Sequence, residues 1–75
     1  MLRRELAYSK QEYREYFYYL EFCQDTAMFY LTTEHQPSGG PLEIKRVPLQ
    51  EAYGQHYYQD ALLLIKEELF KHYSL

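Results

Sequence analysis

The excess of tyrosine is the sequence feature that most constrains how this chain can fold. Ten of its 75 residues are tyrosines, and most lie between Tyr13 and Tyr30 or between Tyr53 and Tyr58. A tyrosine ring is a large apolar body with one polar tip, so it suits a boundary between a dry region and water. A domain this small buries only roughly 60% of the surface of its unfolded chain. The surplus aromatic surface is therefore expected to contact another molecule.

Composition is that of an ordinary globular domain. Hydrophobic residues make up 47% and charged residues 25%, which argues against disorder and predicts a single domain over residues 1–75. Cys23 is the only cysteine, so no disulfide can form within the chain, and an unpaired thiol is typical of a reducing compartment. The sequence shows neither a signal-peptide pattern nor an apolar run of about 20 residues. A cytoplasmic location is therefore expected.

A helix is predicted over residues 9–25, after an N-terminal segment of residues 1–8. Ser9 and Glu12 match a capping box, in which the two side chains satisfy backbone N–H groups at a helix start. The residues that follow recur at helical spacing and would share one face of the helix: Tyr13, Tyr16, Phe17, Leu20 and Cys23.

The middle of the chain is predicted to form a β-hairpin. Residues 27–33 are rich in aromatic and β-branched types, and apolar and charged residues alternate over residues 42–47. The Pro/Gly cluster of residues 35–41 lies between them as a loop. The alternative extends the first helix to about Thr33 and leaves a linker of a dozen residues or more, which is long for a compact domain.

A second helix is predicted over residues 48–73. Pro48 suits its first turn, and Gly54 weakens the helix there. The expected fold is therefore α+β, a small α-β-β-α domain with two amphipathic helices packed with a β-hairpin. The alternative fold is a helical hairpin with a long linker. The apolar stripe of the second helix consists of Tyr58, Ala61, Leu62, Ile65, Leu69 and Tyr73.

Two apolar pairs remain outside these core stripes. Tyr18 and Phe22 lie opposite the first stripe, and Leu63 and Phe70 lie well round from the second. One core needs only one stripe from each helix, so these pairs are expected to contact another protein, most simply a second copy of the chain. The alternative places Tyr18 on the surface and tucks the phenylalanines under loops. The predicted interface comprises Tyr18, Tyr19, Phe22, Tyr30, Leu63 and Phe70.

Candidate chemical groups are sparse. His35, His56 and His72 are too dispersed to predict a metal site, and Cys23 is expected to act as a small core residue and not as a nucleophile. The Gly-containing loop of residues 35–41 lacks the context of a phosphate-binding loop, although its tip could enter a partner's groove. No cofactor, metal or catalytic residue is predicted.

The net charge of −3 does not favour a general phosphate-backbone binder. The predicted function is a small non-enzymatic protein-binding or regulatory module, of adaptor or inhibitor type, that occupies a surface of a larger protein, with a homodimer as the expected form. The alternative is a nucleic-acid-binding module in which tyrosines stack on bases. Its basic residues would be Arg3, Arg4, Lys45 and Arg46.

Overall fold

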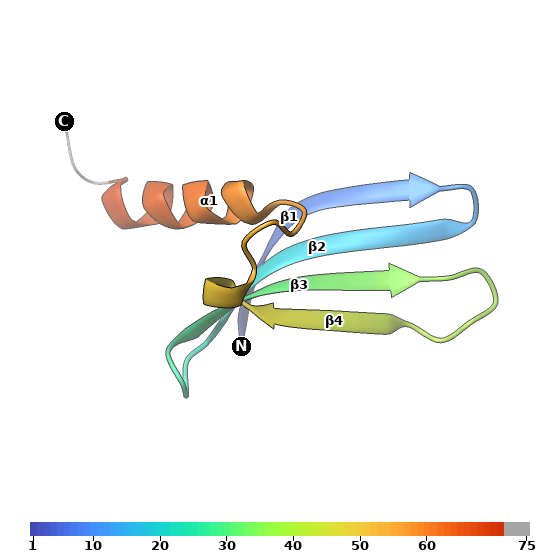
Figure 1. Cartoon of the computed structure of the whole chain (residues 1–75), viewed down its shortest axis with the longest axis horizontal. Helices are drawn as coiled ribbons and strands as arrows, with labels where there is room; N and C mark the ends of the chain where they lie inside the picture. The colour runs from blue at the N-terminus through green and yellow to red at the C-terminus, as the bar shows by residue number, and fades with distance from the viewer. Residues whose placement is uncertain (72–75) are drawn as a thin grey trace.

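A computed structural model, which describes residues 1–71, shows one four-stranded antiparallel sheet (Figure 1). The strands lie side by side in chain order, so the sheet is an uninterrupted meander. A 3-10 turn and one α-helix follow the last strand. The elements are β1 (Leu2–Gln11), β2 (Arg14–Cys23), β3 (Met28–Gln36), β4 (Glu43–Pro48), η1 (Leu49–Glu51) and α1 (Tyr58–Phe70).

The predicted α-β-β-α fold is wrong, and so is the alternative of a helical hairpin with a long linker. Residues 9–25 form no helix, because they contain the end of β1, a tight turn and the whole of β2. Ser9 pairs with Tyr16 across these two strands. The capping-box spacing from Ser9 to Glu12 therefore leads into a hairpin turn, at which Glu12 adopts a φ of 56°.

β2 gave a helical pattern because both of its faces are aromatic. Side chains alternate between the two faces of a strand, and in β2 the alternation of apolar and polar residues is largely lost. The same residues then also fit a helical period. Aromatic residues favour strands over helices, and β2 is hydrogen-bonded on both sides, to β1 and β3. The face toward α1 carries Tyr16, Tyr18, Leu20 and Phe22, and the opposite face carries Glu15, Phe17, Tyr19, Glu21 and Cys23.

The expected hairpin in the middle of the chain is present as β3 and β4. Its register pairs Leu31 with Val47 and His35 with Glu43. Gly39 in the connecting loop has a φ of 71°, which glycine adopts without the steric cost that a Cβ would bring. The hairpin forms half of the sheet and not all of it, since β2 pairs along the other edge of β3.

The C-terminal helix is shorter than the predicted range of residues 48–73. Pro48 ends β4, η1 follows, and α1 begins only at Tyr58. Gly54 and Tyr57 have φ values of 88° and 66°, so the backbone turns away from a helical path at both residues. His72 and Tyr73, which the sequence placed on this helix, lie outside the described residues.

The hydrophobic core is thin and lies at one end of the sheet. Among the described residues, the buried hydrophobic residues are Leu20, Leu31, Ala52 and Ala61. Figure 1 shows α1 over the end of the sheet at which β4 finishes, with its C-terminal part projecting past the strands. On the other half of that face, the loop that leads into α1 places the Tyr57 ring 4.5 Å from the ring of Tyr18.

The face of the sheet turned away from α1 holds a charged cluster across all four strands. Arg3 of β1 donates to Glu21 of β2 at 2.7 Å and to Glu34 of β3 at 2.8 Å. Arg46 of β4 donates to the same Glu21 at 2.9 Å, and the hydroxyl of Thr32 donates to it as well. The Glu21 side chain is only 3% exposed. The cluster ties both edge strands to the two central strands.

These bonds set the ionisation of Glu21. Burial alone would raise the pKa of its carboxyl, but the hydrogen bonds from Thr32, Arg46 and Arg3 outweigh burial and lower the pKa to about 2. The guanidinium of Arg3 also lies 4.0 Å from the centre of the Tyr19 ring. Tyr19 is therefore part of this structural cluster.

Candidate functional site

One side of α1 carries an apolar seam. Tyr58, Leu62, Ile65 and Leu69 follow one another at spacings of four, three and four residues, which places them along a single line on the helix. Tyr58 and Ile65 are half-buried, whereas Leu62 is 37% and Leu69 is 65% exposed. The seam is thus only partly covered by the chain's own core.

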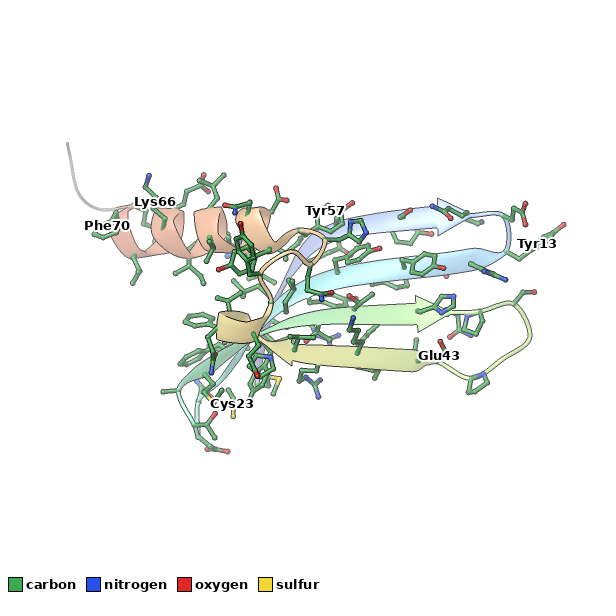
Figure 2. The ribbon with its side chains drawn as sticks, viewed as in Figure 1. Tyr13, Cys23, Glu43, Tyr57, Lys66 and Phe70 are labelled. Carbon is green, nitrogen blue, oxygen red and sulfur yellow. The ribbon has the colours of Figure 1, made fainter. Side chains whose placement is uncertain are left out.

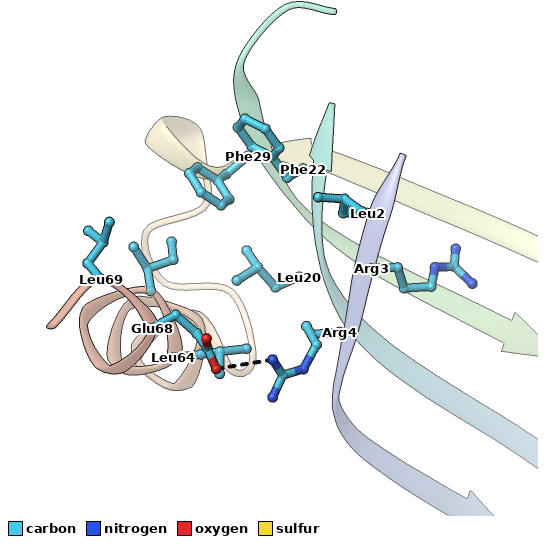
Figure 3. A pocket seen from close by; sticks show the side chains of 10 residues that line it. Leu2, Arg3, Arg4, Leu20, Phe22, Phe29, Leu64, Glu68 and Leu69 are labelled. Atoms are coloured by element: carbon cyan, nitrogen blue, oxygen red, sulfur yellow. Dashed lines mark hydrogen bonds and ion pairs between the residues drawn. The ribbon is translucent and has the colours of Figure 1, made fainter. Parts of the chain in front are cut away.

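The strands supply an apolar wall opposite the C-terminal half of this seam. Phe22 and Phe29 are paired residues of β2 and β3, and their ring centres lie 4.8 Å apart. Leu2 and Leu20 extend this wall across β1 and β2 (Figure 3). The cleft between the wall and α1 has a volume of about 350 Å³. It is open because α1 continues past the strands.

The rim of this apolar cleft is charged. Arg4 donates to Glu68 at 3.2 Å, which links β1 to α1 at the edge of the cleft (Figure 3). Lys71 donates to the other oxygen of Glu68 at 3.0 Å. The bond from Lys71, followed by that from Arg4, lowers the pKa of Glu68. Both pairs are exposed, so they contribute little to the stability of the fold.

A second apolar hollow, also of about 350 Å³, adjoins the first part of the seam. Tyr58 and Leu62 line it from α1, and Leu49 of η1 lines it from below. Phe29 lines this hollow as well as the main cleft. The two hollows therefore share the Phe29 ring, and together they follow the length of the seam. We call this combined surface, with the seam as one wall, the α1 cleft.

The structure does not bring the six predicted interface residues together in one patch. Phe22 lines the α1 cleft, and Leu63 and Phe70 lie on α1 with 52% exposure each. Tyr19 and Tyr30 lie on one face of the sheet, and Tyr18 lies on the opposite face. No observation shows which of the six contacts a partner, so each remains a prediction.

The sequence did not single out the exposed part of the seam. Leu62 and Leu69 fit the expected core stripe of the last helix, and they were assigned to the core for that reason. The signal that could have distinguished them is the spacing of four, three and four residues, which is typical of a helix that packs on another helix. Leu2 and Phe29 carried no comparable signal, because their positions depend on strand pairing.

Tyr18 lies beside a different, polar hollow of about 450 Å³ on the same face of the sheet. Its ring lies 4.5 Å from that of Tyr57, and burial, followed by the proximity of Tyr57 and Tyr16, raises its pKa. Tyr16 stacks on His35 at 4.5 Å, and His35 Nδ1 lies 3.1 Å from a carboxylate oxygen of Glu43. These rings support the far half of the sheet, which α1 does not cover.

The sequence predicts that Cys23 lies on a helix, but in the structure it is the last residue of β2 and is half-buried. The side-chain hydroxyl of Thr26, and then the backbone of Thr26 and Asp25, lower the pKa of its thiol through hydrogen bonds. Figure 2 places Cys23 near the β2–β3 turn. Across residues 1–71, no three His, Cys, Asp or Glu side chains are grouped so as to hold a metal ion.

The basic residues of the alternative nucleic-acid function are engaged within the chain. Arg3 and Arg46 bond to Glu21, and Arg4 bonds to Glu68. Lys45 donates to Gln55 at 3.3 Å. A phosphate backbone would have to compete with these carboxylates for the arginines, which counts against that function.

No protein-family model, curated protein or solved structure matches this chain. Within the described part of the chain, α1 is too short and too polar to cross a membrane, and no other helix could do so.

Proposed function

We propose that this chain is a small non-enzymatic protein-binding module, of adaptor or inhibitor type, and that the α1 cleft receives an apolar helical stripe of a bound protein. The observation that carries this proposal is the uncovered seam of α1 beside the wall formed by Phe22 and Phe29. A larger protein and a second copy of the chain could each supply such a stripe. A cytoplasmic setting belongs to the proposal, since the single thiol suits a reducing compartment.

The chemistry of the cleft favours a protein segment over a reacting substrate. Most of its lining is aliphatic and aromatic, and its charged groups are already paired, Arg4 with Glu68 at the rim and Arg3 with Glu21 and Glu34. A seam with heptad spacing is complementary to another amphipathic helix, whose apolar residues would pack between its own. The partly exposed Leu62 and Leu69 are the side chains that such a helix would cover.

Site-specific photocrosslinking tests this function. Benzoylphenylalanine replaces Leu62 in one variant and Tyr13 in a control, and both are expressed in cells of the chain's own source. Tyr13 is 81% exposed at the β1–β2 turn, far from α1 (Figure 2). We expect irradiation to link the Leu62 variant, and not the Tyr13 variant, to one defined protein.

Each outcome of this experiment is informative. A product of about twice the chain's mass identifies a second copy, and a heavier product identifies another protein by mass spectrometry. Either supports protein binding at the cleft. Equal labelling at both positions, or no product at Leu62 although the variant is folded, would refute the proposed function.

A further inference from the structure

We infer that the α1 cleft is filled by α1 of a second copy, with the two helices antiparallel and their seams in contact. This inference rests on the proposed function and deepens it by naming the occupant. The dimer would leave accessible the sheet face that carries Tyr19 and Tyr30, and a larger partner could bind there.

The first argument is that the surface is complementary to itself. It offers a projecting apolar helix and, directly beside it, an apolar cleft. A two-fold axis between two copies places each helix against the other's cleft, so both features are satisfied by one contact. The antiparallel register that matches the seams places Leu62 against Ile65 of the second copy and Tyr58 against its Leu69.

The second argument is electrostatic. The residues that flank the seam are Gln59 and Lys66 on one side and Ala61 and Glu68 on the other. In an antiparallel pair, equivalent flanks face each other, so Lys66 lies near Gln59 of the second copy, whereas on the other flank Ala61 is buried in its own copy's core and Glu68 bonds to Arg4. No two like charges meet, and the Arg4–Glu68 pair at the rim can remain.

The third argument is the size of the core. A domain with so few fully buried hydrophobic side chains gains little stability from packing within one copy. Dimerisation would bury both exposed leucines of the seam in each copy. The contact therefore adds apolar burial where the isolated chain lacks it.

Mass measurement and seam variants test this inference. We expect the full chain to have about twice its 9.2 kDa mass in sedimentation equilibrium, and a Leu62→Lys, Leu69→Lys variant to be a monomer, with dimer affinity reduced at least roughly 100-fold. Leu63→Lys is the control, because Leu63 lies off the seam and its 52% exposure falls between those of Leu62 and Leu69. It should remain dimeric.

Spin labels determine the orientation of the helices. Single cysteines replace Asp60 of α1 or Lys71, which directly follows α1, in a Cys23→Ser background; both residues are exposed. At a rise of about 1.5 Å per residue, the antiparallel register separates the two labels along the axis by roughly 10 Å at position 60 and roughly 22 Å at position 71. Electron–electron resonance should therefore give a clearly longer distance at position 71.

Three results would overturn the inference: a folded native monomer at high concentration, a dimer that survives the double lysine change, or equal distances at positions 60 and 71. The first two leave the proposed function standing if photocrosslinking at Leu62 identifies another protein. Circular dichroism of each variant checks that its sheet is intact, so a loss of dimer is not mistaken for unfolding.

Discussion

Replacement of Glu21 by Gln should destabilise the sheet strongly, because Glu21 holds both edge strands. The change removes the negative charge that Arg3 and Arg46 share. One oxygen can still accept from Thr32, but the amide NH₂ group would then face the N–H donors of Arg3. Arg46 would lose its carboxylate, Arg3 would keep only that of Glu34, and a buried donor would have no acceptor.

The pKa of Glu21 sets the expected magnitude. Its value of about 2 lies about 2.5 below the ordinary 4.5, which corresponds to about 3 kcal/mol at about 1.4 kcal/mol per pH unit. The Arg3 and Arg46 side chains are 38% and 41% exposed, so water screens part of this interaction. We expect Glu21→Gln to lower the free energy of unfolding by about 2 kcal/mol at pH 7.

The effect should depend on pH in one direction. A carboxyl whose pKa is lower in the folded state stabilises the fold above its unfolded pKa of about 4.5, and this contribution is lost as the pH falls through about 2. The difference between the native chain and Glu21→Gln should therefore be constant from pH 7 to pH 5. Below that it should shrink toward pH 2.

Urea unfolding followed by far-ultraviolet circular dichroism measures this difference, at one fixed protein concentration so that dimerisation contributes equally. Glu43→Gln is the control, because the Glu43 side chain is 67% exposed and its contact, with His35 at 3.1 Å, lies at the edge of the sheet. It should change stability by less than about 0.5 kcal/mol. A loss of the same size in both variants, or a Glu21 effect that does not shrink in acid, would refute the reasoning.

Three further predictions follow from the fold. Leu20→Ala should lower the free energy of unfolding, measured with urea, by about 2–5 kcal/mol because Leu20 is central to the thin core. Leu63→Ala should lower it little, and similar losses in the two variants would contradict the assigned core. Gly54→Ala should destabilise the chain by about 1 kcal/mol, because the φ of 88° at Gly54 is unfavourable for a residue with a Cβ. Glu12→Gly should not destabilise it, because glycine readily adopts the φ of 56° at this position. The thermal unfolding midpoints of both variants check this prediction. Fluorescence titration with labelled single and double strands should show no tight binding that weakens steeply with salt, and such binding would restore the nucleic-acid function.

The sequence located the features that depend on local chemistry. The Pro/Gly cluster located the loop between β3 and β4, because these residues disfavour regular structure in any context, although His35 and Gln36 of the predicted loop belong to β3. The apolar stripe from Tyr58 onward gave the helix, because its period suits no strand. The lone Cys23 excluded an internal disulfide. Each of these follows from short stretches of the chain.

Short stretches of sequence could not predict that β1 and β2 are strands. The aromatic run that ends at Phe22 satisfies the helical and the strand period alike, so its own pattern does not decide. Hydrogen bonding to β1 and β3 decides it, and those partners are up to about twenty residues away. The helix predicted over residues 9–25 failed for this physical reason.

By itself, then, the sequence determined that this chain carries more aromatic surface than a small core can bury. Only the tertiary structure decided where that surface lies. Strand pairing placed Tyr19 under Arg3 on one face and Phe22 against Phe29 on the other. It also gathered Arg3, Glu21 and Arg46 from three strands into one cluster. Such neighbours meet through the register of the sheet, which the chain sets over its whole length and not within any single segment.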